Sequence, residues 1–424
     1  MSHLLIVDAS KTNVHVAARA VELGHEVTFV DTEVFRERYA DEHTARLLEP
    51  VHHRLSVEGS IDSDHAATAI ADWHHAHPID GMFTMLDQNV PGVSRLAAAN
   101  GIRSTSLQGV LTAKNKATTR QALDRAGLAS CRYAQVCGIA DVVAAAHSIG
   151  FPLIVKPVQG YGKLMTRRID SPTELGLFCQ EYSVMRDCLA EMDKAFVSED
   201  LLLEEYLDGT MYSVEIGADE RGTYPFMVTE RRRPEYNQLI ELGSLMPTSA
   251  EPVLRDALAD YASRVVRALG LDVGIFHLEI IVTARGPVLV EANPRLMGGA
   301  LPLLYGWSTA DNIFDHLIRL HVGQPIGWNA LAKTTRFATA RQIAPVQAGV
   351  AASDIDALFM RERCGWVVSS AVNVRKGMAV QPMTCNFDSL GYLHVVADSH
   401  DESVQMAERA LSEIEQALGV ALAR

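Results

Sequence analysis

Apolar runs and mixed segments alternate through the first hundred residues of the chain. Short apolar runs cover residues 4–8, 26–31 and 81–86, and the stretch that ends at Gly24 has the spacing of a helix. Alternation of strands and helices is typical of a parallel sheet with crossover helices. The turn at 8–12 lacks the GxGxxG spacing of a dinucleotide site, so the pattern predicts an α/β domain without NAD.

The pattern changes beyond residue 150, where the apolar runs are longer and the turns between them are short. Strands are predicted over 151–157, 201–207, 211–217, 224–231, 273–282 and 287–293. Long strands with short connections are typical of antiparallel sheet, which predicts an α+β block. A helix is predicted before this block over 112–127, with Thr112 as its N-cap and Gly127 at its C-terminal end.

Shorter strands follow in the last hundred residues. They are predicted over 336–344, 364–374 and 392–397, before a closing helix over 402–418. These elements predict a third, smaller domain. The histidine-rich patch at 73–77 is interpreted as a solvated helix end rather than a metal site.

Composition narrows the class of protein. The chain has 424 residues, of which 48% are hydrophobic, and this is long enough for two or three buried cores. The net charge of -14 argues against a nucleic-acid-binding surface, although a few cations can still hold a small anion. The six cysteines form no CxxC pair, and no apolar run approaches the length of a membrane span. We therefore predict a cytoplasmic protein with neither a nucleic-acid nor a membrane partner.

Two acidic residues stand out in the apolar stretch 273–295. Read as a hairpin, this stretch brings Glu279 opposite or nearly opposite Glu291. A three-residue connection puts Glu279, Glu291 and Asn293 on one surface, whereas a two-residue turn shifts that register by one position.

Neighbouring carboxylates repel each other unless a cation compensates them. Carboxylate and amide oxygens are hard ligands, which suits Mg²⁺ bridging the phosphates of a nucleotide. The alternative is an exposed hairpin face with scattered acids, but strands this apolar are expected to be buried. We favour the magnesium site.

Lysines supply the opposite charge. Lys156 ends an apolar strand and enters a loop whose Gly160 and Gly162 would let backbone N–H groups approach phosphate oxygens. Lys116 and Arg120 share one face of the predicted helix at i, i+4 spacing. The alternative for Lys156 is a lysine that reaches solvent from a strand end.

Five motifs occur in a fixed order over most of the chain. They are Asn115-Lys116 with Arg120, Ile-Val-Lys-Pro at 154–157, Glu-Glu-Tyr-Leu at 204–207, His-Leu-Glu at 277–279 and Val-Glu-Ala-Asn-Pro-Arg at 290–295. As a set they resemble the ATP-grasp superfamily. The resemblance implies an ATP-grasp fold, with an N-terminal parallel-sheet α/β domain, a small ATP lid and a C-terminal antiparallel catalytic domain.

The resemblance also implies domain boundaries and residue roles. The expected domains are an N-terminal domain at 1–110, linking helices and lid at 111–210, a catalytic core at 211–330 and a C-terminal subdomain at 331–424. The cofactors are ATP and Mg²⁺, which Mn²⁺ could replace. The implied nucleotide-binding residues are Lys116, Lys156, Gly160, Gly162, Glu204, Glu205, Leu207 and Asp208, and the implied metal ligands are Glu279, Glu291 and Asn293.

Segments 227–231 and 241–247 are similar to the substrate-facing part of L-amino acid ligases and related carboxylate-amine ligases. This similarity implies that Glu241 and Arg295 face the substrates and the acyl intermediate. The expected activity is ADP-forming ligation of a carboxylate, such as an amino acid, to an amine through an acyl phosphate, by a homodimer. The alternatives are a carboxylase or purine-pathway ligase of the same superfamily, and a nucleotide-binding module without turnover.

Four positions depart from the superfamily pattern, and one of them is Asn115, which stands where the family often has Asp. Met211 stands where an acidic residue often binds ribose, so either Asp208 or Glu215 substitutes for it or that contact is missing. Tyr161 and Lys163 stand in the glycine loop where small residues are usual.

Overall fold

A four-stranded parallel sheet forms the N-terminal part of the molecule. The computed structural model describes residues 1–424 except 11, 40, 328–332 and 387. The strand order is β3-β2-β1-β4, and β1 pairs in parallel with both β2 and β4. The elements are β1 (His3–Val7), α1 (His15–Glu22), β2 (Glu26–Thr32), α2 (Glu42–Leu48), β3 (His53–Val57), α3 (Asp64–Ala76), β4 (Gly81–Thr84) and α4 (Val90–Asn100). The predicted parallel α/β domain is confirmed.

Two helices, not one, link this domain to the next. They are α5 (Leu107–Lys114) and α6 (Lys116–Arg125), so the single helix predicted over 112–127 is wrong. Asn115 has extended backbone angles, and its side chain accepts a hydrogen bond from Thr118 N, which caps α6. Thr112 lies inside α5 instead of capping a helix.

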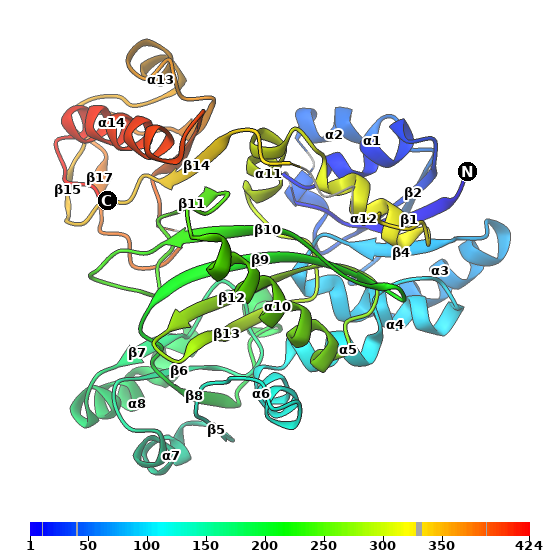
Figure 1. Ribbon diagram of the computed structural model, residues 1–424, viewed down its shortest axis with the longest axis horizontal. Helices are drawn as coiled ribbons and strands as arrows, with labels where there is room; N and C mark the ends of the chain where they lie inside the picture. Colours follow the sequence, from blue (N-terminus) through cyan, green and yellow to red (C-terminus); the bar gives the residue numbers. More distant parts are fainter. Residues whose placement is uncertain (11, 40, 328–332, 387) are drawn as a thin grey trace.

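A second four-stranded sheet forms a separate layer in the order β5-β8-β6-β7. All of its pairs are antiparallel, and its apolar side packs against α7 and α8. In Figure 1 it lies at the lower left, below the large sheet. Its elements are β5 (Tyr133–Val136), α7 (Val142–Ile149), β6 (Leu153–Pro157), β7 (Arg167–Ile169), α8 (Pro172–Asp187), α9 (Glu191–Lys194) and β8 (Leu201–Glu205).

An eight-stranded antiparallel sheet is the centre of the molecule, in the order β13-β12-β9-β10-β11-β14-β18-β16. Its strands are β9 (Thr210–Asp219), β10 (Gly222–Arg232), β11 (Gly243–Met246), β12 (Gly274–Thr283), β13 (Gly286–Asn293), β14 (Phe337–Gln342), β16 (Ser369–Val372) and β18 (Gly391–Ala397). The predicted antiparallel block is therefore confirmed. Within the strand predicted over 364–374, only Ser369–Val372 pairs with β18.

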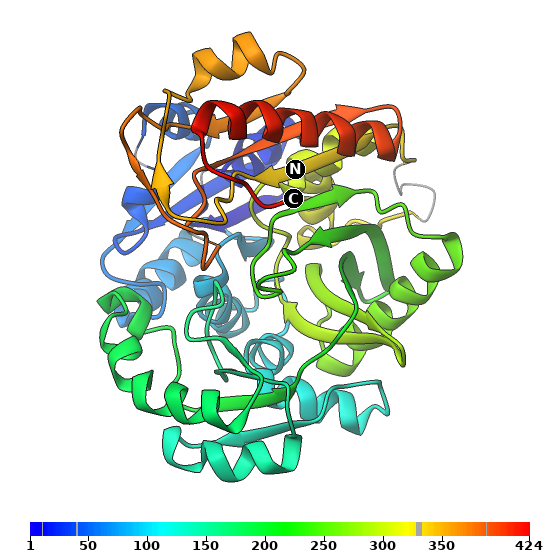
Figure 2. The same cartoon turned by 90° about the vertical axis from the view of Figure 1, so that its left-hand side faces the viewer.

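Two long helices pack on this large sheet. Helix α10 (Pro252–Leu269) packs on β9 and β10, while α14 (His400–Leu418) packs on β14 and β18. In both views α14 lies at the top and the second sheet at the bottom, with the large sheet between them (Figure 1, Figure 2). The remaining elements are α11 (Leu301–Thr309), α12 (Ile313–His321), β15 (Gly349–Val350), α13 (Ala357–Arg363) and β17 (Ala379–Val380). Within the described residues, no helix combines the length and apolar character needed to cross a membrane.

Candidate functional site

The β12–β13 hairpin places two carboxylates side by side. Glu279 pairs directly with Glu291, and His277 pairs with Asn293. The turn has two residues, because Thr283 pairs with Gly286, and a regular ladder from that turn would place Glu279 opposite residue 290. A bulge between Glu279 and Ile280 shifts the register by one and restores the Glu279–Glu291 pair. The turn therefore has the length of the two-residue alternative, while the shared surface of Glu279 and Glu291 is the one that the three-residue alternative predicts.

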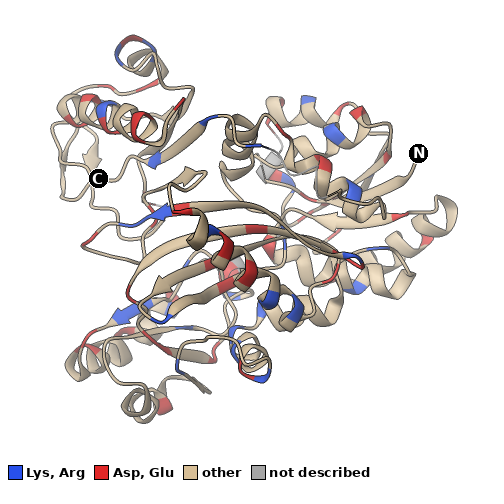
Figure 3. Ribbon diagram, in the orientation of Figure 1, with Lys and Arg blue, Asp and Glu red and all other residues tan. Residues whose placement is uncertain are grey.

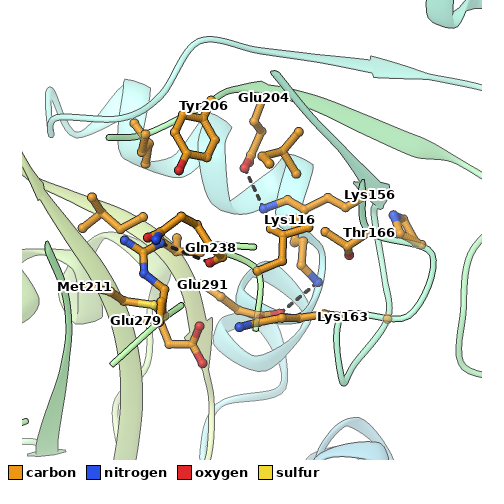
Figure 4. Close-up of a pocket in the computed structure, with 18 of the residues that line it drawn as sticks. Lys116, Lys156, Lys163, Thr166, Glu204, Tyr206, Met211, Gln238, Glu279 and Glu291 are labelled. Atoms are coloured by element: carbon orange, nitrogen blue, oxygen red, sulfur yellow. Dashed lines mark hydrogen bonds and ion pairs between the residues drawn. The ribbon is translucent and has the colours of Figure 1, made fainter. Parts of the chain in front are cut away.

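A cavity opens between this hairpin and the second sheet. It encloses about 880 Å³ of empty space that continues into solvent (Figure 4). Its wall combines lysines, glutamates and apolar side chains from β6, β8, β9, β12 and β13. The site residues expected from the sequence that line it are Lys116, Lys156, Gly160, Glu204, Glu205, Leu207, Glu279 and Glu291.

Glu204 is held between two cations at one end of this cavity. Arg120 Nε lies 2.7 Å from Glu204 Oε1, and Lys156 Nζ lies 2.6 Å from Glu204 Oε2. Burial alone would raise the pKa of Glu204, but Arg120 and Lys156 outweigh it and hold the pKa at about 2. Three buried charges thus form one group, with a net positive charge facing the cavity.

Lys116 binds one of the paired carboxylates. Its Nζ lies 2.9 Å from Glu291 Oε1, and Figure 4 shows this contact beside the Lys156–Glu204 pair. Burial opposes the charged form of Lys116, but Glu291 outweighs that effect and raises its pKa. Lys116 is the first residue of α6, directly after the Asn115 cap, and its side chain lines the cavity.

A second cavity, of about 1450 Å³ and open to solvent, borders the same carboxylate pair. Two of its acids each contact two cations. Glu241 Oε1 accepts from Lys163 at 2.9 Å, and Arg231 binds the other oxygen of Glu241. Burial opposes the negative charge of Glu241, yet the two cations lower its pKa far below the ordinary range.

Asp87, from the N-terminal domain, shows the same arrangement. Lys114 contacts one of its oxygens, and Arg295 Nε lies 3.3 Å from the other. Burial would raise the pKa of Asp87, but Lys114 and Arg295 hold it at about 2. At both Asp87 and Glu241, two cations therefore contact one carboxylate, which leaves a local excess of positive charge. Elsewhere on the ribbon, acidic and basic residues are interspersed (Figure 3).

One row of directly paired residues forms the floor of the second cavity. Arg231 pairs with Ser244, Ser244 with Ala340, Ala340 with His394, and His394 with Ser369. All five line the cavity. Arg231 Nε and Nη1 and His394 Nδ1 are buried without a hydrogen-bond partner in the structure. Because buried polar atoms are normally satisfied, this floor suits a polar small molecule.

His277 sits beside the carboxylate pair on the same face. Its Nδ1 lies 2.6 Å from Glu215 Oε1, and its Nε2 lies 3.7 Å from Glu279 Oε1. Burial opposes the imidazolium, but Glu215 and then Glu279 raise the pKa of His277 to about 9. The histidine is therefore protonated at neutral pH and offsets one negative charge.

The donor set fits a magnesium ion that is also bound by a nucleotide. Among the described residues, no group of three or more His, Cys, Asp and Glu side chains converges as a metal cage. Mg²⁺ commonly takes one or two protein carboxylates and completes its shell with phosphates and water. Glu279, Glu291 and Asn293 supply two carboxylates and an amide on one face, and Lys116 shows that a cation fits against Glu291.

The structure divides the expected site residues between the two cavities. The second cavity is lined by Gly162, Glu241, Asn293 and Arg295, and both cavities are lined by Gly160, Glu279 and Glu291. Asp208 is exposed and lines neither. Glu215 also lines neither cavity, because it is fully buried against His277.

Several lining residues were not singled out as site residues from the sequence. Tyr206, Arg233 and Gln238 join Met211 in the first cavity. Arg231 lies on the floor of the second cavity, and only its segment, 227–231, was expected to face the substrates. Tyr206 lies inside the Glu-Glu-Tyr-Leu motif, between two expected site residues, so the sequence did carry a signal for it. Arg233 and Gln238 lie in an irregular segment with no strand or helix periodicity, so nothing local indicates where they point.

Two family models match the chain. Residues 17–102 match the ATP-grasp N-terminal domain, and residues 149–302 match the ATP-grasp domain. The chain therefore carries both domains in this order and has the ATP-grasp fold, as the motif set predicts.

The chain is similar to several individual proteins, two of which are named as a synthase or a ligase. The uncharacterised protein y4rH of Sinorhizobium fredii is 29% identical over 301 residues, which are 71% of this chain and 60% of that protein. Carnosine synthase 1 of Homo sapiens is 26% identical over 52% of this chain and 28% of the synthase. The crystal structure of L-amino acid ligase from Bacillus licheniformis has a TM-score of 0.76 at 18% identity, covering 97% of this chain and 98% of that chain. The chain spans less than two thirds of the length of these curated relatives.

Proposed function

We propose that the protein is an ADP-forming ligase that joins a carboxylate to an amine through an acyl phosphate. One observation carries the proposal: Glu279 and Glu291 line both cavities, so they lie where a nucleotide on one side meets a second molecule on the other. This is the arrangement that transfer of a phosphoryl group between two bound molecules requires.

The first cavity is the proposed ATP site. Lys116 and Lys156 would contact the phosphates, and the backbone at Gly160 would close over them. Glu204 and Leu207 would border the adenine. These residues lie together in one cavity that the second sheet and the large sheet both line, which supports the assignment.

Glu279, Glu291 and Asn293 would hold the magnesium ion. When bound, Mg²⁺ neutralises charge that develops on the transferring phosphate oxygens. The side chains of this chain do the remaining work. Lys116 forms an ion pair with Glu291 in the structure. When a phosphate binds, the lysine would exchange this carboxylate for a phosphate oxygen.

The second cavity is the proposed site for the carboxylate and the amine. Asp87 and Glu241 each neutralise only one of the two cations that contact them, and this local surplus of positive charge suits a carboxylate and an acyl phosphate. Arg295 reaches this cavity directly after β13, close in the chain to the metal ligand Asn293. Its guanidinium would stabilise the phosphoryl oxygens.

The proposed chemistry has two steps. A carboxylate oxygen attacks the γ-phosphorus, the bond to the β-phosphate oxygen breaks, and ADP leaves. The amine nitrogen then attacks the acyl carbon, the bond from that carbon to the phosphate oxygen breaks, and phosphate leaves with the release of one proton. Lys163, which ties the glycine loop to Glu241, would keep water from the acyl phosphate while the loop is closed.

An amino acid is the proposed carboxylate substrate. The names of an L-amino acid ligase and a carnosine synthase among the similar proteins support this class. The buried, unpartnered nitrogens of Arg231 and His394 on the cavity floor also suit a small polar acid. The neutral form of His394 prevails there, because burial lowers its pKa to about 4.

Coupled measurement of ADP release tests the proposal. The protein is incubated with Mg²⁺, ATP and pairs of L-amino acids, and products are identified by mass spectrometry. We expect an amide product and equimolar ADP, with activity reduced at least 100-fold in Glu291→Gln. Glu230→Gln is the matched control, since Glu230 lies one residue before Arg231 on the opposite face of the same sheet. ADP release that needs bicarbonate and forms no amide would contradict the proposal.

A further inference from the structure

Arg120 is buried beneath the hairpin that carries the paired carboxylates. Its side chain is 1% exposed, and it is one of the largest fully buried side chains of the described chain. The guanidinium makes three contacts with geometry suited to its planar fork. Nε donates to Glu204 at 2.7 Å, Nη1 donates to the carbonyl of Leu289 at 2.7 Å, and Nη2 donates to the carbonyl of Val290 at 2.9 Å.

Those two carbonyls belong to the bulge. Leu289 pairs with Ile280, and Glu291 pairs with Glu279, so Val290 is the extra residue of β13. Side chains supply hydrogen bonds to main-chain groups of the bulge. Arg120 donates to the two carbonyls, and the Tyr261 hydroxyl accepts from Leu289 N at 3.0 Å. A bulge disrupts the ladder locally, so such contacts decide whether the bulge persists.

We propose that Arg120 is a positioning residue that holds the Val290 bulge in place and so keeps Glu291 opposite Glu279 as a metal ligand. The proposal rests on the ligase function above. The two-residue turn on its own pairs Glu279 with Val290. A one-residue slip in a strand moves each side chain to the other face of the sheet, so without the bulge Glu291 and Asn293 would leave the face that carries Glu279.

The same guanidinium connects the bulge beside the proposed metal ligand Glu291 to Glu204 in the proposed nucleotide site. Arg120 shares Glu204 with Lys156, one of the proposed phosphate-binding lysines. A lysine at position 120 would keep a positive charge near Glu204. It lacks the planar fork that reaches a carboxylate and two carbonyls at once, so it would not hold the bulge.

Binding of Mn²⁺ in the presence of a non-hydrolysable ATP analogue tests this role without turnover. Electron paramagnetic resonance of Mn²⁺ gives its affinity in the wild type and in Arg120→Lys. We expect at least a tenfold weaker affinity for Mn²⁺ in the variant, while affinity for the analogue without metal changes less than threefold. Arg125→Lys, on the exposed face of the same helix, is the control and should match the wild type.

Deletion of Val290 separates positioning from a general structural role. In the deleted chain a regular ladder from the two-residue turn places Glu291 opposite Glu279 without a bulge. We expect the deletion variant to bind Mn²⁺ within threefold of the wild type, and we expect Arg120→Lys to have no further effect in that background. This measurement also stands if Arg120→Lys does not fold alone.

The outcomes are distinct. Unchanged Mn²⁺ affinity in Arg120→Lys overturns the positioning role, and so does a deletion variant that loses Mn²⁺ binding. If Arg120→Lys weakens binding equally with and without Val290, the arginine acts by another route and the proposal is wrong. A wild-type protein that binds the analogue but no Mn²⁺ would refute the ligase site itself.

Discussion

Substitution of Glu204 by glutamine should remove a stabilising interaction whose size follows from its pKa. The folded protein holds the Glu204 pKa at about 2, against an ordinary value of 4.5. A difference of roughly 2.5 pKa units corresponds to about 3 kcal/mol of stability at neutral pH. Glu204→Gln loses this contribution and also leaves Arg120 and Lys156 without their shared anion, so we expect it to unfold at least about 3 kcal/mol more easily at pH 7.

The sign of the pH dependence follows from the lowered pKa. The contribution is fully present above pH 4.5 and is lost as the pH falls toward 2, because the unfolded chain binds the proton first. Between pH 4.5 and pH 3.5 the wild type should lose about 1 kcal/mol more than Glu204→Gln. The difference between the two proteins therefore shrinks as the solution becomes acidic.

Urea unfolding followed by circular dichroism at several pH values measures both effects. Glu205→Gln is the matched control, since Glu205 is adjacent in the chain but pairs with two largely exposed arginines, Arg132 and Arg285. Exposed pairs contribute less than about 1 kcal/mol, so this variant should stay close to the wild type. Equal stability of Glu204→Gln and the wild type from pH 3.5 to pH 7 would refute the reasoning.

Three further predictions concern the metal, the loop and a buried histidine. Glu279→Gln should raise the Mg²⁺ concentration for half-maximal activity at least tenfold. A magnesium titration at saturating ATP measures this midpoint, and an unchanged midpoint would exclude Glu279 as a ligand. Lys163→Met removes the ion pair between the glycine loop and Glu241. Steady-state kinetics should therefore show an ATP KM about fivefold higher, while the melting temperature stays unchanged. An unchanged KM would argue against loop closure. Burial lowers the His321 pKa from 6.5 to about 4, so its contribution is present above pH 6.5 and is lost as the pH falls through 4. From pH 7 to pH 4 the wild type should lose about 3 kcal/mol more than His321→Asn in urea unfolding, and parallel curves would contradict this.

The sequence allowed the carboxylate pair to be predicted because its signal is local. Glu279 and Glu291 lie in two apolar strands joined by a short turn, so pairing of the two strands brings them opposite each other to within one residue. The bulge that sets their register could not be read in the same way. It depends on Arg120, which is distant in the chain, and on contacts with main-chain carbonyls that leave no residue pattern.

Other features depend on contacts between distant segments. The sequence does not show that Lys163 reaches Glu241, or that Asp87 lies between Lys114 and Arg295. The break between α5 and α6 did have a local signal, since Asn115 is a good N-cap, but helical periodicity on both sides concealed it.

Transfer of an oxygen isotope tests the proposed intermediate most directly. The protein is supplied with Mg²⁺, ATP, an amine and an amino acid whose carboxylate carries ¹⁸O, and the released phosphate is examined by mass spectrometry. An acyl phosphate leaves one carboxylate oxygen on the phosphate, so we predict ¹⁸O in the phosphate and one labelled oxygen fewer in the amide. Amide formation with unlabelled phosphate, or with AMP in place of ADP, would contradict the account.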